Sequence, residues 1–198
     1  MTTRDVVRGK ELPRKTLHLT TASIPLALWA GVSQRTVATL LVALLGLAVI
    51  VEFARRRSAN VATQFDVTVG VMLRPHEAAN GITGATWLLA TFAITCLAAP
   101  LAAAIAATWA GAVGDASAAV VGKAWRRTRG GEGKTLAGSA ACLVATAVGA
   151  WWLADFSPPL GVALGLAAAS AERPVVSLDD NVRVTAGTAL VAVLLLQL

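Results

Sequence analysis

The chain has 198 residues and a formal net charge of +6, and it is 56% hydrophobic but only 14% charged. A soluble protein carries roughly 25% charged residues, and a water-soluble domain of this size has too little interior for so much apolar surface. The composition therefore excludes an ordinary soluble domain and indicates one integral membrane domain over residues 1–198.

The positions of the basic residues and the cysteines argue against nucleic-acid binding and against cysteine-based sites. The basic residues form short clusters between apolar runs, without the basic face that nucleic-acid binding requires, so we expect no nucleic-acid partner. Cys96 and Cys142 lie inside apolar segments without Cys or His at metal-binding spacing. Neither a zinc site nor a disulfide framework is indicated.

Seven apolar segments approach or reach the roughly 20 residues that a membrane-spanning helix needs. In chain order they cover residues 17–34, 36–53, 82–99, 101–122, 136–154, 158–172 and 184–198. The first resembles a secretory signal, but other apolar segments follow at once, so we interpret it as a retained span. The more polar stretch 58–80 is expected to be an interfacial helix or a re-entrant piece. The sequence thus predicts an all-α bundle of about seven spans.

The basic residues predict the orientation of this bundle. With a cytoplasmic amino end, the cytoplasmic pieces are 1–16, 54–81, 123–135 and 173–183, and they hold 16 of the 17 Lys and Arg residues. Arg35 alone falls on the other side. The positive-inside rule therefore predicts a cytoplasmic amino end and an external carboxyl end. Ten of the eleven carboxylates fall on the cytoplasmic side as well, which that rule does not explain and a polar site would.

The first polar group leads into the first predicted span. Glu11, Arg14, Lys15 and His18 are spaced i, i+3, i+4, i+7 and share one face of a helix. Anchoring at the membrane interface explains Arg14 and Lys15 as well as a site does. Neither Glu11 nor His18 helps anchoring, so we interpret the group as part of a polar site.

The second group, Arg74-Pro-His-Glu77-Ala-Ala-Asn80-Gly81, precedes the third predicted span. Arg74, Glu77 and either Asn80 or Gly81 again repeat at helical spacing. Helix capping is the alternative role for Asn80, since Asn and Gly suit helix ends.

The third group contains Asp115, seven residues before the end of the fourth predicted span. At 1.5 Å per residue, Asp115 lies about 10 Å below the cytoplasmic surface. An ionised Asp there costs roughly 2.5–3.5 kcal/mol on insertion scales, so we expect a polar cavity and a nearby cation. Small residues on the same helix allow another backbone or a ligand to approach closely: Gly111, Gly114, Ala118 and Gly122.

The loop after this span contains Gly131-Glu132-Gly133-Lys134-Thr135. It is not a P-loop, because the G-x-x-x-x-G-K-[ST] pattern requires glycine at position 128, where Thr128 stands, and no strand is predicted before it. Glycines still let backbone N–H groups approach phosphate, Lys134 supplies charge, and the N-terminus of the next helix favours an anion. We interpret this loop as a triphosphate-binding segment of another architecture.

The fourth group comprises Glu172 and the run Asp179-Asp180-Asn181 before the last predicted span. Adjacent Asp and Asn residues serve as helix caps. Their oxygens also suit Mg²⁺, which bridges carboxylates to substrate phosphates. Both interpretations stay open, and the second would place Asp179 and Asp180 with Asp115 around one metal ion.

In this order the motifs resemble those of the polyprenol kinase family, which includes dolichol kinases, phytol kinases and CTP-dependent diacylglycerol kinases. The matching pieces run nearly end to end: E-x-x-R-K-x-x-H at 11–18, E-x-x-x-G at 77–81, G-D-x-x-A-x-x-x-G at 114–122, K-T-x-x-G-S at 134–139, and Glu172 with Asp-Asp-Asn at 179–181. The resemblance implies a membrane enzyme that transfers the γ-phosphate of CTP to a lipid hydroxyl at the cytoplasmic face.

The resemblance also implies roles for individual residues. Those expected to bind the phosphates are Gly114, Gly122, Lys123, Gly133, Lys134, Thr135 and Gly138, with Arg126 and Arg127 as weaker candidates. Arg14 and Lys15 are expected to hold the phosphorylated product. Asp115, with Asp179 and Asp180, would coordinate a Mg²⁺ cofactor.

A base near the lipid hydroxyl would assist transfer. His18 is a candidate because histidine titrates near pH 6.5, and Glu77 and Glu172 are rivals. The residues do not select among phytol, polyprenol or dolichol, and diacylglycerol as acceptors. They also do not distinguish CTP from ATP or UTP.

Two other functions stay open. A cytidylyltransferase joins CTP to a lipid phosphate, but its family carries a long Lys/Arg/Asp-rich signature near the carboxyl end, and nothing comparable follows Asn181. A small transporter also uses ionisable residues within the membrane. Transport calls for polar groups along a path to both faces, whereas the outer half of nearly every predicted span carries no charge.

Overall fold

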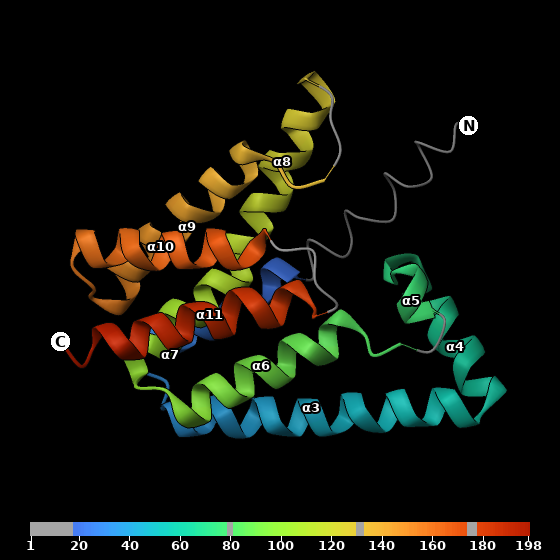
Figure 1. Ribbon diagram of the computed structural model, residues 1–198. Coiled ribbons are helices and arrows are strands. Elements are labelled where there is room, and N and C mark those ends of the chain that lie inside the picture. The colour runs from blue at the N-terminus through green and yellow to red at the C-terminus, as the bar shows by residue number, and fades with distance from the viewer. Residues whose placement is uncertain (1–17, 79–80, 130–132, 174–177) are drawn as a thin grey trace.

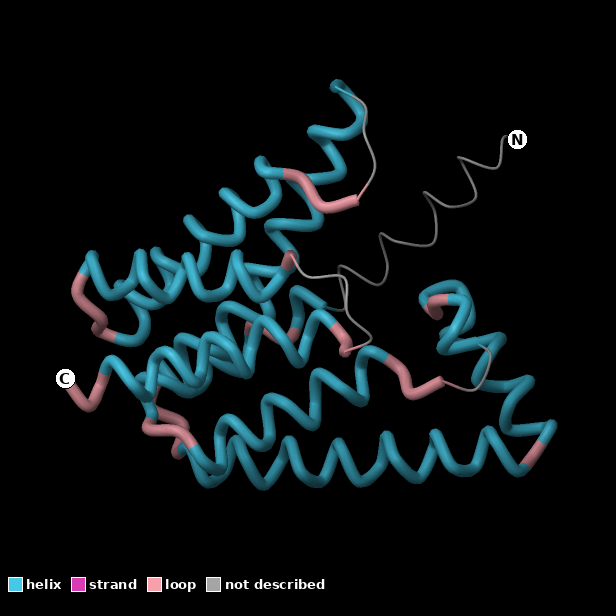
Figure 2. Tube along the Cα trace, viewed as in Figure 1, coloured by secondary structure: helices cyan, strands magenta, loops and turns pink. Residues whose placement is uncertain are grey.

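The computed structural model of the protein describes residues 18–78, 81–129, 133–173 and 178–198 (Figure 1). Helices make up most of these residues, and no strand occurs among them (Figure 2). The all-α prediction is confirmed.

The helices follow the predicted apolar segments closely. The described elements are α2 (Ser23–Trp29), α3 (Gln34–Arg57), α4 (Ala59–Val69), η1 (Gly70–Met72), α5 (Pro75–Ala78), α6 (Gly84–Ala98), α7 (Leu101–Trp109), η2 (Ala110–Gly114), α8 (Asp115–Arg129), α9 (Leu136–Ala154), α10 (Pro158–Glu172) and α11 (Asp180–Leu195).

Within the described residues, three helices are long and apolar enough to cross a membrane. They are Gln34–Arg57, Leu101–Thr128 and Leu136–Ala154, and the second is a continuous helix that joins α7, η2 and α8. Gly84–Ala98 is apolar but shorter. These lengths and compositions are compatible with an integral membrane protein.

The first predicted span, 17–34, differs from the others because its helix is interrupted. Turn residues at 21–22 precede α2, which is seven residues long. Pro25 explains the interruption, since proline has no N–H and its ring clashes with the carbonyl four residues earlier, that of Thr21. The Thr21 carbonyl instead accepts a hydrogen bond from the N–H of Ile24 at 3.0 Å.

The long helix Leu101–Thr128 is the most buried of the three. In Figure 1, α3 and α6 lie along one side of the bundle and α9 and α10 along the other, and α7 and α11 lie between them. Fully buried alanines line α7 and let neighbouring helices approach closely: Ala103, Ala104, Ala106 and Ala107.

The outer face of α3 is apolar. Leu40, Leu44, Leu47 and Ile50 are each more than half exposed and are spaced along one helical face. Such a row is unfavourable in water but suits contact with lipid.

The predicted polar groups gather at one end of the bundle. The end of α3, the beginnings of α6, α9 and α11 and the end of α10 all lie toward the right in Figure 1. The turns between α6 and α7 and between α9 and α10, and the carboxyl end, lie at the left. An arm formed by α4, η1 and α5 turns away from the bundle at the polar end, and α4 buries none of its residues. Within the predicted stretch 58–80, the described residues up to Ala78 are therefore largely helical.

Candidate functional site

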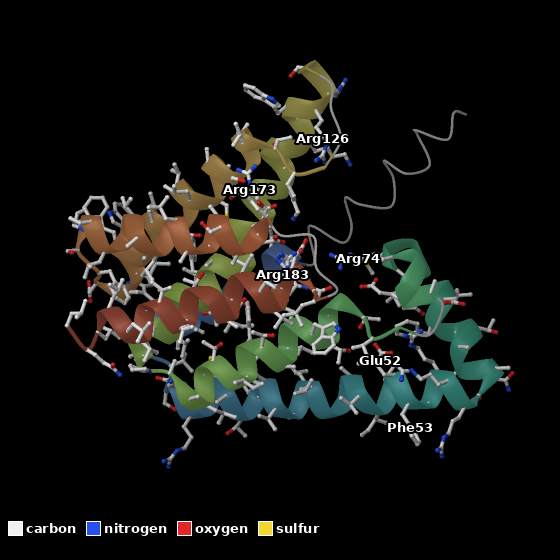
Figure 3. All side chains as sticks on the ribbon, in the orientation of Figure 1. Glu52, Phe53, Arg74, Arg126, Arg173 and Arg183 are labelled. Atoms are coloured by element: carbon white, nitrogen blue, oxygen red, sulfur yellow. The ribbon has the colours of Figure 1, made fainter. Side chains whose placement is uncertain are left out.

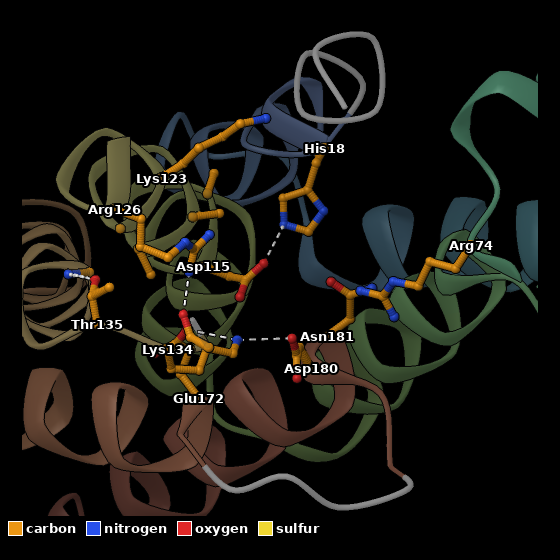
Figure 4. Close-up of a pocket in the computed structure, with 16 residues that line it drawn as sticks. His18, Arg74, Asp115, Lys123, Arg126, Lys134, Thr135, Glu172, Asp180 and Asn181 are labelled. Carbon is orange, nitrogen blue, oxygen red and sulfur yellow. Dashed lines mark hydrogen bonds and ion pairs between the residues drawn. The ribbon is translucent and has the colours of Figure 1, made fainter. Parts of the chain in front are cut away.

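A cavity of about 510 Å³ lies at the polar end of the bundle (Figure 4). Its lining draws on all four polar groups of the sequence. The charged side chains at its wall are four cations, Arg74, Lys123, Arg126 and Lys134, and three carboxylates, Asp115, Glu172 and Asp180. His18, Thr135 and Asn181 complete the polar lining.

Asp115 follows a π-helical turn, η2, in the middle of the long central helix. Its N–H donates to the carbonyl of Ala110, five residues back, rather than to that of Gly111 as in a regular α-helix. The Gly111 carbonyl instead lies 2.8 Å from Nε2 of His18. A carbonyl has no proton to donate, so Nε2 carries the hydrogen. Single π-helical turns are frequent at functional sites.

The same nitrogen of His18 faces the Asp115 carboxylate. Nε2 lies 3.8 Å from Oδ2 of Asp115, and both side chains are largely buried (Figure 4). The π-helical turn therefore brings a carbonyl and a carboxylate to one protonated ring nitrogen. A base must use the other nitrogen, Nδ1, when the ring is neutral.

Gly111 and Gly114 allow other helices to pack against the π-helical turn. A Cβ at Gly111 would lie 2.2 Å from Oγ1 of Thr185, and one at Gly114 would lie 2.5 Å from Oγ1 of Thr146. Gly114 thus lies in the helix packing and not at the cavity wall, where its predicted phosphate-binding role would place it.

Lys134 lies between two carboxylates from different helices. Its Nζ is 2.7 Å from Oε1 of Glu172 and 3.0 Å from Oδ2 of Asp180. Burial lowers the pKa of Lys134, but Glu172 and Asp180 outweigh burial and hold that pKa above its usual value. Burial raises the pKa of Asp180, but Lys134 and Arg183 outweigh it and hold that pKa below its usual value. Both groups are therefore charged at neutral pH.

The Lys-Thr and glycine pieces form the wall where α8 and α9 meet. Thr135 caps α9, because its Oγ1 accepts a 3.0 Å hydrogen bond from the N–H of Gly138. A Cβ at Gly138 would lie 2.7 Å from the carbonyl oxygen of Ala118, so α8 and α9 pass each other at close range there. Gly122, Thr135 and Gly138 all line the cavity.

The α8 side of the cavity carries Lys123 and Arg126 (Figures 3 and 4). Arg126 donates a hydrogen bond to the carbonyl of Gly133. Gly133 has φ of +74°, a conformation that glycine adopts without a Cβ clash. Arg127, the other weak candidate, is exposed and lies outside the lining.

No protein-family model, curated protein or solved structure matches this chain. The chemistry open to the cavity follows from its own charges. Four Lys and Arg side chains suit a polyphosphate. Three carboxylates offset most of their charge, so a polyphosphate is best accommodated together with a divalent cation.

Two predicted site residues lie behind the cavity wall. The buried carboxylate of Glu77 accepts hydrogen bonds from the N–H groups of Arg74 at 2.7 Å and Gly84 at 2.8 Å. Oδ1 of Asp179 caps α11 by accepting from the N–H of Asn181 at 3.0 Å, and Oδ2 lies 2.6 Å from Nη1 of Arg74. For Asp179 the structure shows the capping alternative.

Sequence reasoning did not predict the buried ion pair between Glu52 and Arg55 at the end of α3. Nη2 of Arg55 lies 2.7 Å from Oε2 of Glu52, and Arg55 also donates to the carbonyls of Glu77 and Gly81. Glu52 accepts from the N–H of Thr83 at 2.9 Å. The pair ties α3 to the turn that carries Glu77. In the sequence this pair is marked by a Glu and an Arg three residues apart at the end of an apolar helix. The same pattern is typical of an ordinary basic loop.

Several predictions concern residues outside the described part of the chain. These are the ones for Glu11, Arg14, Lys15 and Asn80. Within the described ranges, no three His, Cys, Asp or Glu side chains are close enough to hold a metal ion together.

Proposed function

We propose that the protein is a CTP-dependent lipid-alcohol kinase of the polyprenol kinase type, embedded in the membrane with its active site at the cytoplasmic face. The observation that carries the proposal is the cavity, where Asp115, Lys134 and Glu172 meet at the polar end of an apolar helical bundle. A kinase requires cations for the phosphates, carboxylates for a metal and a group beside the acceptor hydroxyl.

The proposed topology has seven spans and a cytoplasmic amino end. The spans are α2, α3, α6, the long helix of α7 and α8, α9, α10 and α11, of which three reach spanning length by themselves. The long helix has 28 residues, or about 42 Å at 1.5 Å per residue, so it extends beyond about 30 Å of hydrocarbon. Among the described residues, every Lys and Arg except Arg35 falls in the pieces predicted to be cytoplasmic, and four of them line the cavity, which supports its cytoplasmic placement.

The triphosphate is assigned to the wall between α8 and α9. Lys123, Arg126 and Lys134 supply positive charge there. The Thr135 hydroxyl accepts from the backbone of α9, which leaves its hydrogen to donate to a phosphate oxygen. The N-terminus of α9 adds backbone N–H groups and a favourable dipole. Phosphate binding displaces Lys134 from its two carboxylates.

Asp115 and Asp180, which line the cavity from α8 and α11, would hold a Mg²⁺ ion, with Glu172 as the third nearby carboxylate. Mg²⁺ usually takes one or two carboxylates and completes its octahedral shell with water and phosphate oxygens, so a dedicated cage of three ligands is not required. Asp179 is less suitable than predicted, because it caps α11 and pairs with Arg74 behind the cavity wall, whereas Asp180 lines the cavity. When bound, the metal neutralises charge on the phosphates.

Of the three candidate bases, His18 has the best position. Glu172 is paired with Lys134, and Glu77 is buried behind the wall with its oxygens bound to backbone N–H groups. His18 lines the cavity, and its Nε2 is oriented by Gly111 and Asp115. Nδ1 is thus assigned to accept the proton of the lipid hydroxyl.

The lipid alcohol is expected to enter sideways from the bilayer, with its hydroxyl at the cytoplasmic boundary. The charged lining lies at one end of the bundle, which supports an enzyme rather than a transporter with a polar path to both faces.

A direct comparison of donors and acceptors tests the proposal. Purified protein with Mg²⁺ is incubated with CTP, ATP or UTP and with phytol, a polyprenol or diacylglycerol. We expect one alcohol to be phosphorylated, with CTP as the preferred donor, and Lys134→Met to lose this activity. Absence of a phosphorylated lipid from every combination would overturn the proposal.

A further inference from the structure

Arg74 reaches the cavity from the arm, on the side opposite Lys123 and Arg126 (Figure 4). Its side chain is 27% exposed, whereas that of its ion-pair partner Asp179 is 5% exposed. The guanidinium therefore lies at the wall, and the carboxylate lies behind it.

The guanidinium of Arg74 has more N–H groups than its contact with Asp179 uses. It has five N–H groups in a planar fork, and among the described residues its side chain pairs with Asp179 through Nη1 at 2.6 Å. A fork of this kind matches two oxygens of a phosphate group.

The backbone of Arg74 is held in place independently of its side chain. Its N–H donates to Oε2 of Glu77 at 2.7 Å, and Oε1 of Glu77 accepts from the N–H of Gly84 at 2.8 Å. Glu77 is 3% exposed. This buried carboxylate joins the arm to the beginning of α6, so the backbone of Arg74 is positioned independently of its ion pair.

Asp179 uses its two oxygens differently. Oδ1 caps α11, while Oδ2 neutralises Arg74. An anionic oxygen on Nη1 occupies the position that a phosphate oxygen would take. We propose that Arg74 binds a phosphate group of the substrate or product, and that Asp179 holds the guanidinium in place until that group arrives. This inference rests on the proposed function, and it adds a phosphate ligand on the wall opposite α8.

Asp179→Asn separates the two roles of the carboxylate. Asn caps a helix about as well as Asp, so the beginning of α11 is retained. The charge that competes for Arg74 is lost. Asp179→Asn should therefore strengthen phosphate binding several-fold, whereas Arg74→Ala should weaken it roughly 10- to 100-fold, the usual effect of losing a charge-assisted hydrogen bond. The double variant should bind as weakly as Arg74→Ala.

The test is calorimetric titration of the full-length protein in detergent with Mg²⁺–CTP and, separately, with a lipid monophosphate. Weaker binding of CTP alone in Arg74→Ala assigns Arg74 to the nucleotide, and weaker binding of the lipid monophosphate alone assigns it to the product. Arg57→Ala is the matched control, because Arg57 is an exposed arginine at the same end of the bundle and outside the lining. It should bind both probes like the wild type.

Two results would overturn the inference alone: wild-type affinity of Arg74→Ala for both probes, or a loss in Asp179→Asn as large as that in Arg74→Ala. If the wild type bound neither probe, the proposed function would fail as well. Thermal unfolding is measured for every variant. If Arg74→Ala does not fold, Arg74→Lys keeps the charge but loses the fork, and wild-type affinity in that variant would contradict the bidentate contact.

Discussion

Nζ of Lys134 lies 2.7 Å from Oε1 of Glu172 and joins the segment before α9 to the last residue of α10. Arg74 and Asp179 form a similar pair between the arm and the beginning of α11. Two cations of the cavity are thus paired with carboxylates from other elements. A bound polyphosphate competes for these cations, so ligand binding and helix packing share the same charges.

Asp115 is predicted to be required for transfer but not for folding. Asp115→Asn keeps the volume of the side chain and removes the charge that faces His18 and Lys134. We expect transfer to fall by roughly 10²–10³-fold, as when one group that stabilises developing charge is removed. Initial rates and thermal unfolding in detergent check both statements.

Asp155→Asn is the matched control for Asp115→Asn. Asp155 follows α9 at the opposite end of the bundle and has φ of 56°, a conformation that Asn also adopts. Its activity should equal that of the wild type. Retained transfer in Asp115→Asn, or unfolding of that variant, would refute the assigned role.

The charge cluster around Lys134 predicts how stability depends on pH. The pKa of Asp180 is below its usual value when folded, so its contribution is fully present above the unfolded pKa of about 3.9 and is lost as pH falls through the folded pKa. The pKa of Lys134 is raised, so its contribution is present below about pH 10.4 and is lost as pH rises through the folded pKa.

Unfolding temperatures measured across pH check this prediction. The wild type should show no dependence from these two groups between about pH 5 and 9, and a decline under acid conditions. Asp180→Asn should show a smaller acid decline. An equal acid decline in the two proteins would show that Asp180 is not stabilised by its partners.

The close passage of α8 and α9 predicts that Gly138 does not tolerate a side chain. A Cβ there would lie 2.7 Å from the carbonyl oxygen of Ala118, so Gly138→Ala must separate the helices, at about 1–3 kcal/mol. Gly46→Ala is the control, since a Cβ at Gly46 meets nothing within 4 Å. It should leave stability unchanged or raise it by about 0.5–1 kcal/mol. Equal unfolding temperatures for both variants would be inconsistent with this packing.

The buried pair Glu52–Arg55 is predicted to hold the arm against the bundle. Arg55→Met leaves Glu52 buried without its partner and removes donors to the carbonyls of Glu77 and Gly81. Removing one partner of a buried pair destabilises by roughly 3–5 kcal/mol. Hydrogen exchange should therefore accelerate in α4 and at the beginning of α6, with little change in α9 and α10.

Arg56→Met is the comparison for Arg55→Met. Arg56 lies 3.8 Å from the same carboxylate, but its side chain is 41% exposed, and exposed pairs contribute about 0–1 kcal/mol. Exchange in this variant should match the wild type. A uniform acceleration over the whole bundle in Arg55→Met would show a global rather than a local role.

The helices and part of the site could be predicted from the sequence because their signals are local. Apolar runs mark the helices, and Asp115 is conspicuous because a charge in an apolar run needs a polar surrounding. Lys134 and Thr135 follow glycines at the beginning of a helix, which is a local anion-binding pattern. All three residues line the cavity.

The remainder depends on contacts between residues far apart in the chain. An Asp at position 179 suits both metal binding and helix capping, so the sequence does not decide between the two roles. In the structure Asp179 caps α11 and also contacts Arg74, 105 positions away in the chain. In the sequence Arg55 is one of three consecutive arginines that are typical of a basic loop. Its buried role depends on hydrogen bonds such as the one that it donates to the carbonyl of Gly81. The π-helical turn before Asp115 has no sequence pattern beyond its glycines, which packing explains equally well.

The central claim is tested most directly by following the label from CTP. The protein is incubated with Mg²⁺, a lipid alcohol and CTP labelled either at the γ- or at the α-phosphate. A kinase transfers the γ-label to the lipid and leaves the α-label on CDP, and this is the result that we predict. A γ-label released as pyrophosphate, with the α-label on a lipid when lipid phosphate is supplied, would identify a cytidylyltransferase and contradict the account.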